Sequence, residues 1–219
     1  MNNLHVSKKG IKTHFSYNWW VYVVLPVLAI SVIFYSFYLK DRLKANEQIT
    51  IFTEINIADK REIRKGLLDE LKDDGILKIN FTDAAGANEM KYTLLEAQGF
   101  SLSDILIFSE STFNDSIIAN LVQFDDDFVN QIKAKNEHVE IYQTLNSHSY
   151  GVKIFDFDDK EYNEKFNFSS WLNFDNLEEN YYMVLNSKSR NVGKFSTHKK
   201  AKDENVAAFK AFTYLLGEK

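Results

Sequence analysis

Residues 19–39 read WWVYVVLPVLAISVIFYSFYL, a run of 21 positions without a charged side chain. A helix rises about 1.5 Å per residue, so this run can cross the roughly 30 Å hydrocarbon core of a bilayer. Tryptophan stands at its start and tyrosine near both ends, where amphipathic rings favour the headgroup region. The run therefore predicts one membrane-spanning helix.

A cleaved signal peptide is the alternative, because it also has a basic start and an apolar middle. The run is longer than a usual signal core, and no small-x-small cleavage motif precedes Lys40. Basic residues flank the run equally on both sides, so the positive-inside rule does not discriminate. We expect an uncleaved single-pass anchor in the cell membrane, with residues 1–18 cytoplasmic and the following domain extracytoplasmic.

Charge separates sharply along the chain. Residues 1–39 carry three lysines and no acid, which leaves 23 basic and all 31 acidic residues, a net charge of −8, in residues 40–219. So acidic a domain is a poor candidate for binding nucleic acid or anionic lipid over a large surface. The absence of cysteine is compatible with an extracytoplasmic location. We expect a polar stalk over residues 40–48 and one domain over 49–219.

Strand and helix patterns alternate in the first part of this domain. β-branched and apolar runs predict strands at 49–53, 76–81 and 104–109. Helical spacing predicts a helix that begins with the capping pair Asp59 and Glu62, and a second helix over 88–98. This order predicts an α/β fold, a mainly parallel sheet with helices on both faces.

The later elements are expected to complete the same sheet, with one strand free to run antiparallel. We expect Phe52, Ile79, Ile105 and Ile107 to form one sheet interior. Further strands are expected at 139–145, 150–156 and 181–186, and further helices at 111–122 with Ser111 as the cap, at 127–135 and at 203–216.

Several motifs resemble one family when they are taken in order. They are Ser103–Phe108 (SDILIF), Tyr150-Gly151-Val152, and Lys188–Asn191 (KSRN) before a final helix that ends in a leucine pair. Together they resemble the extracellular solute-binding proteins of ABC importers, of the type II periplasmic-binding-protein class. The resemblance implies a ligand-binding protein that works with a transporter.

The chain departs from that family in one respect. A second lobe lies between the YG strand and the last strand in the family, whereas only residues 157–178 occupy that place here. The resemblance therefore implies a single lobe on a membrane tether, which binds free solutes weakly and acts with a membrane-protein partner. An envelope enzyme with an unrecognised active site stays open as the alternative, and an extracytoplasmic sensor is a weaker one.

Candidate binding residues follow from where a parallel sheet exposes function, at the loops beyond the carboxyl ends of its strands. The same residue types also serve as helix caps, which is the alternative explanation. The candidates are Thr53, Glu54 and Asn56 after the first strand, Thr82 and Asp83 after the second, and Ser109, Glu110 and Ser111 after the third.

Trp171 lies in an aromatic segment, residues 166–174 (FNFSSWLNF). Such rings can stack on a sugar or form an exposed protein-binding patch. The alternative is a cover over the sheet, because so many exposed aromatics would be a liability.

No catalytic residue, metal site or cofactor is predicted. The acidic runs 125–127 and 156–159 lack the ligand spacing and turn glycine of a calcium loop. The histidines of the domain are scattered without zinc-ligand spacing. The S-x-x-K match at Ser196–Lys199 lies in a basic loop, out of context for an acylating enzyme.

Overall fold

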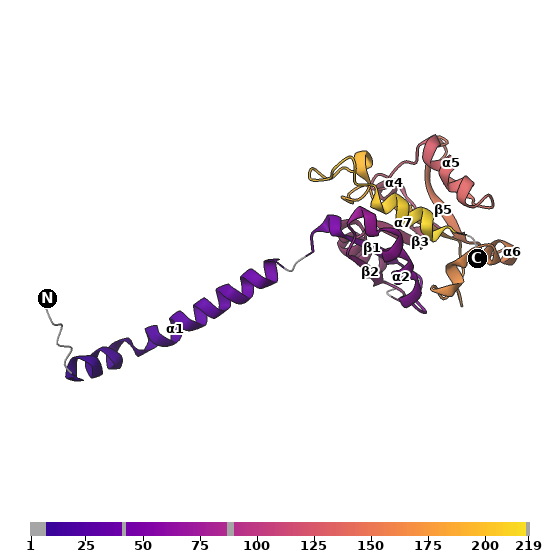
Figure 1. Cartoon of the computed structure of the whole chain (residues 1–219). Coiled ribbons are helices and arrows are strands. Elements are labelled where there is room, and N and C mark those ends of the chain that lie inside the picture. The colour runs from indigo at the N-terminus through magenta and orange to yellow at the C-terminus, as the bar shows by residue number, and fades with distance from the viewer. Residues whose placement is uncertain (1–7, 41–42, 87–89, 218–219) are drawn as a thin grey trace. The chain divides into compact units, whose positions relative to one another are not determined.

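The computed structural model describes residues 8–40, 43–86 and 90–217, and Figure 1 traces the chain. The chain divides after Leu43 into two compact units. The first contains a helix, α1 (Lys8–Lys40), with Pro26 inside it. Its segment Trp19–Ser36 has a mean hydropathy of 1.9 and is long and apolar enough to cross a membrane or to serve as a signal sequence.

The second unit is an α/β domain around a six-stranded sheet with the order β2-β1-β3-β6-β5-β4. Gly75 adopts a left-handed φ of +74° before β2, which therefore begins at Lys78, two residues later than expected. The strands are β1 (Gln48–Thr53), β2 (Lys78–Asp83), β3 (Ile105–Ser109), β4 (Ile141–Gln143), β5 (Ser149–Phe155) and β6 (Tyr181–Leu185).

The sheet is mixed, which corrects the expectation of a mainly parallel one. β1 pairs in parallel with β2 and β3. β6 pairs antiparallel with both β3 and β5, and β4 pairs antiparallel with β5. Sequence patterning misses this because a strand buried on both faces is apolar whichever way it runs. The reversal of β6 places Tyr181 opposite Ser109, at the carboxyl end of β3.

Helices cover both faces of the sheet, as expected. One buried cluster joins Ile51 to Leu67 and Phe212, and the other joins Phe52 to Leu95. Ile79, Ile105 and Ile107 share the first cluster, but Phe52 does not, because successive strand residues point to opposite faces. The helices are α2 (Arg61–Glu70), α3 (Lys91–Leu94), α4 (Asp115–Ile118), α5 (Asp126–Lys135), α6 (Lys160–Glu164) and α7 (Ala207–Leu215).

Helix starts differ from the expected ones where another side chain takes the cap. The Asp59–Glu62 pair does not cap α2, because Asp59 instead accepts a hydrogen bond from the backbone N–H of Arg61. Asn114, not Ser111, caps α4 by accepting from the backbone N–H of Ile117.

Element lengths also differ in places. The helix expected over 88–98 is α3 followed by a π-helical turn, Leu95–Phe100, with residues 88 and 89 outside the described part. The last helix begins at Ala207, four residues later than expected.

The segment 157–178 packs as a cover. Trp171 is only 2% exposed, and its ring centroid lies 5.8 Å from that of Phe81 and 6.2 Å from that of Phe168. The backbone N–H of Ala58 donates to the carbonyl of Trp171 at 2.9 Å. Trp171 therefore belongs to the core, which corrects the expectation of an exposed stacking or binding side chain.

Candidate binding site at the carboxyl edge

One edge of the sheet gathers most of the predicted residues. We call it the carboxyl edge, because the parallel strands β1, β2 and β3 end there and β6 begins there. Glu54 follows β1, Asp83 ends β2 and Ser109 ends β3. The strand pairing therefore brings the three predicted strand-end positions to one side of the domain.

A buried ion pair lies at the centre of this edge. The Nζ atom of Lys91, at the start of α3, lies 2.9 Å from Oε2 of Glu54 and 2.7 Å from Oγ of Ser109. The same Oε2 accepts the backbone N–H of Ser109 at 3.0 Å. The Glu54 side chain is 3% exposed, yet its Oε1 has no hydrogen-bond partner among the described residues.

Burial dominates the electrostatics of Glu54. It raises the pKa of Glu54 above its ordinary value, although the charge of Lys91 and the hydrogen bond from Ser109 act in the opposite direction. The pKa of Tyr181 rises to about 12, chiefly through burial and further through the nearby charges of Glu54 and Glu179. The carboxyl edge therefore holds Glu54, whose ionised form is disfavoured by burial, next to the phenol of Tyr181, which stays protonated at neutral pH.

A cavity of about 250 Å³ opens beside Glu54. Its wall is mostly polar and includes the predicted residue Asn56, whereas Trp171 is not part of it. Asn176, on the wall, adopts a left-handed φ of 62°. The lining residues are Glu54, Asn56, Ala84, Ala85, Gly86, Lys91, Asn173, Asp175, Asn176, Leu177 and Tyr181.

Two of the predicted residues shape the loops around the cavity. Asp83 accepts the backbone N–H of Ala85 at 2.9 Å and that of Ile57 at 3.3 Å, so it links the loops after β1 and β2. Thr53 accepts the backbone N–H of Ile55 at 2.9 Å and is fully buried. These contacts make both residues supports of the loops, and neither caps a described helix, which was the alternative explanation.

A row of hydroxyls continues from the ion pair to Glu179. Ser109 Oγ lies 3.2 Å from Ser111 Oγ and 3.2 Å from Thr112 Oγ1. Ser111 donates to Glu179 from its backbone N–H at 2.9 Å and from its hydroxyl at 3.0 Å. Burial opposes the charge of Glu179, but these hydrogen bonds hold its pKa below the ordinary value.

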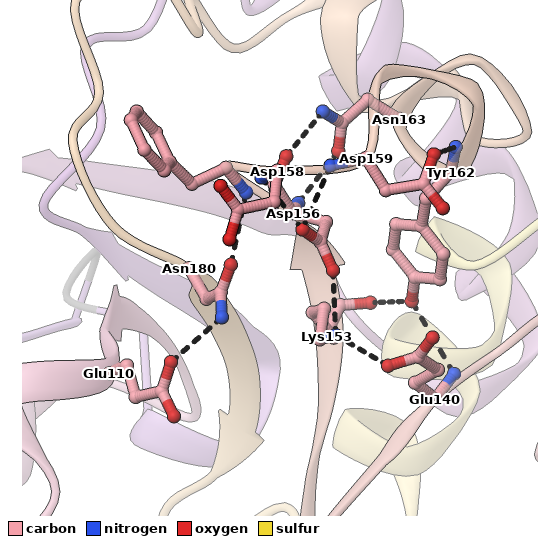
Figure 2. Close-up of polar contacts among 10 residues, drawn as sticks. Glu110, Glu140, Lys153, Asp156, Asp158, Asp159, Tyr162, Asn163 and Asn180 are labelled. Carbon is pink, nitrogen blue, oxygen red and sulfur yellow. Dashed lines mark hydrogen bonds and ion pairs between the residues drawn. The ribbon is translucent and has the colours of Figure 1, made fainter.

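Glu110, the last predicted strand-end residue, takes part in a second set of polar contacts. Its carboxylate accepts from the side-chain amide of Asn180 at 2.8 Å, and the Asn180 oxygen accepts the backbone N–H of Phe157 at 3.0 Å (Figure 2). Glu110 thereby ties the end of β3 to the cover segment.

A further acidic cluster in Figure 2 is closed by hydrogen bonds. Lys153 donates to both Glu140 and Asp156. Burial alone would lower the pKa of Lys153, but these two contacts outweigh burial, so its pKa is raised. Asp156 also accepts the backbone N–H groups of Asp158 and Asp159. In the ranges that the structure describes, no group of three or more potential ligands can hold a metal ion.

A buried polar cluster lies at the opposite end of the strands, where β1 and β3 begin and β6 ends. The Asp104 carboxylate accepts the backbone N–H of Thr50 at 2.7 Å, the hydroxyl of Ser189 and the amide of Asn191 at 2.9 Å. Burial raises the pKa of Asp104 to about 6, against these hydrogen bonds. This cluster fixes the turn that contains Lys188–Asn191.

No protein-family model, curated protein or solved structure matches this chain. The candidate site therefore depends on its own geometry. Sequence reasoning missed Lys91, Glu179 and Tyr181 as members of the edge. Only the strand order reveals Glu179 and Tyr181, because β6 had to be placed in reverse beside β3.

Proposed function

We propose that this chain is a membrane-anchored binding module that holds its α/β domain outside the cytoplasm and acts with a membrane-protein partner. The observation that carries the proposal is Oε1 of Glu54, buried beside the cavity without a partner in the described ranges. An unsatisfied buried acceptor costs about 1–3 kcal/mol. A donor group from a ligand or partner that reaches Oε1 offsets that cost.

The resemblance of the strand and turn motifs to solute-binding proteins of ABC importers supports a transporter subunit as the partner. The membrane tether adds to this, because confinement to one membrane raises the effective concentration of a partner without new contacts. Residues 44–86 and 90–217 contain one sheet, and within these ranges no second lobe covers the cavity to exclude water. We therefore expect free sugars and peptides to bind weakly, with the partner as the main ligand.

A cell-envelope enzyme is the second candidate, and one contact favours it. Lys91 Nζ lies 2.7 Å from Ser109 Oγ, a spacing at which a lysine can activate a serine nucleophile. Two features weigh against catalysis. Ser109 is fully buried, and Lys91 Nζ is already paired with the carboxylate of Glu54.

Calorimetry of the full-length protein in nanodiscs, against a panel of oligosaccharides and peptides, tests this function. We expect dissociation constants on the order of millimolar, near −4 kcal/mol. Glu54→Gln should weaken any such binding further. Glu70→Gln, which alters an exposed carboxylate on α2, should not. Micromolar binding of a small solute would contradict the accessory role and favour a solute receptor.

A further inference from the structure

The segment 188–202 concentrates positive charge on a domain that is otherwise acidic. It contains six basic residues and no acid: Lys188, Arg190, Lys194, Lys199, Lys200 and Lys202. Five of these side chains, all except that of Arg190, are exposed. The salt bridges of Lys194 and Lys202 are long, at 3.8 and 3.9 Å, and solvent screens such surface pairs. The segment therefore presents largely uncompensated charge.

The segment is held firmly rather than loosely attached. Asn191 is fully buried, and its side-chain amide donates to the carbonyls of Ala45 at 3.2 Å and Gln48 at 3.0 Å. The backbone N–H of Thr197 donates to Ser187 at 2.7 Å. Gly193 has a left-handed φ of +54°, and a Cβ there would lie 2.6 Å from the carbonyl oxygen of Asp203. These contacts fix the backbone of the segment around Asn191, Gly193 and Thr197, and Asn191 lies beside the start of β1.

Acidic groups lie at the opposite edge of the same sheet. β6 runs against β1 and β3, so the segment that follows β6 lies at the amino ends of those strands. The carboxyl edge holds Glu54, Asp83, Glu110 and Glu179. The basic segment and these four carboxylates therefore lie at opposite ends of the strands.

We propose that segment 188–202 binds the anionic phospholipid headgroups of the membrane in which α1 is anchored. α1 ends at Lys40 and the domain begins at Lys44, so three residues join them in sequence. Asn191, within the basic segment, contacts Ala45, the second residue of the domain. Lys and Arg side chains within a Debye length of an anionic leaflet, on either side of the membrane, are attracted to it. This inference depends on the membrane anchor in the proposed function.

The test uses the full-length protein in nanodiscs of phosphatidylcholine alone or with equimolar phosphatidylglycerol. The chain has no cysteine, so Ala201→Cys provides a single labelling site within the segment. We expect a headgroup-attached quencher to quench a fluorophore at this site in the anionic discs. High salt should abolish the quenching, because salt screens exposed charges.

Two triple variants test whether the quenching depends on the charges of this segment or on the total charge of the domain. The triple change Lys199→Gln, Lys200→Gln, Lys202→Gln should abolish the quenching. The same number of charges removed elsewhere, by Lys133→Gln, Lys135→Gln and Lys165→Gln, should leave it unchanged. Equal quenching in both lipids, or no loss in the first triple variant, would overturn the inference alone. Failure to incorporate into either disc would refute the anchor and the inference together.

Discussion

Lys91 Nζ lies 2.9 Å from Oε2 of Glu54, and this contact leaves Oε1 of the same carboxylate buried without a partner in the described part of the chain. The two oxygens of one side chain thus have opposite roles. One holds α3 against the ends of β1 and β3, and the other is buried within a residue of the cavity wall. A carboxylate with hydrogen bonds to only one of its two oxygens is suited to accept a hydrogen bond from a group outside the domain.

Lys91→Met should destabilise the domain by about 3 kcal/mol, because it leaves the buried Glu54 carboxylate without its counter-charge. Chemical denaturation of the full-length protein in detergent measures this change. Adding Glu54→Gln to Lys91→Met should recover part of the loss, since no buried charge then remains. Lys160→Met, an exposed change on α6, is the control. An unfolding free energy equal to that of the unmodified protein would show that the pair is not buried.

The contribution of Asp104 to stability should fall as the pH rises from about 4 to about 6. Its pKa is raised from 3.8 to about 6 in the folded domain, so the folded state binds the proton more tightly than the unfolded state does. Ionisation across this window therefore costs stability, about 3 kcal/mol at 1.36 kcal/mol per unit. Asp104→Asn should flatten the pH dependence of the unfolding free energy, and Asp69→Asn should not. A slope that Asp104→Asn leaves intact would contradict the assignment.

Ile107→Ala should cost about 2–5 kcal/mol, the range for large-to-small changes in a core. Ile107 is fully buried in β3, a central strand between β1 and β6. The denaturation midpoint of the Ile107→Ala variant should lie well below that of the Leu102→Ala variant, because the Leu102 side chain is 69% exposed. Equal midpoints for the two variants would place β3 outside the core.

Protease added to spheroplasts should digest the domain and leave a fragment that contains α1. This outcome follows from the proposed anchor with an extracytoplasmic domain. An epitope tag at either end of the chain, read by immunoblot, identifies the surviving part. Protection of the domain until the membrane is permeabilised would reverse the topology.

Much of the fold could be predicted from apolar patterning. The runs at Ile49–Thr53 and Ile105–Ser109 are strands, and helices cover both faces of the sheet. The direction of β6 could not be predicted, because direction is set by pairing with strands distant in sequence. Phe52 was assigned to the wrong face, since strand alternation separates it from Ile105.

The carboxyl edge was predictable only in part. Glu54 and Ser109 follow from the rule that parallel strands expose function where they end. Lys91 could not be identified, because nothing in its local sequence shows that it reaches Glu54 across the loop after β2. The sequence left Trp171 open between an exposed binding side chain and a cover over the sheet, because both use the same aromatic residues, and its burial favours the cover.

Site-specific photocrosslinking in cells tests whether a membrane protein binds at the carboxyl edge. A photoreactive phenylalanine at Asn56, an exposed residue on the wall of the cavity, should yield an adduct with an integral membrane protein identified by mass spectrometry. The same probe at Lys133 on α5 should not. Glu54→Gln should reduce the Asn56 adduct, and Glu70→Gln should leave it unchanged. If no partner binds at this edge, the probe at Asn56 yields no adduct, or an adduct whose yield does not change with Glu54→Gln. Either result would contradict the binding module proposed for this chain.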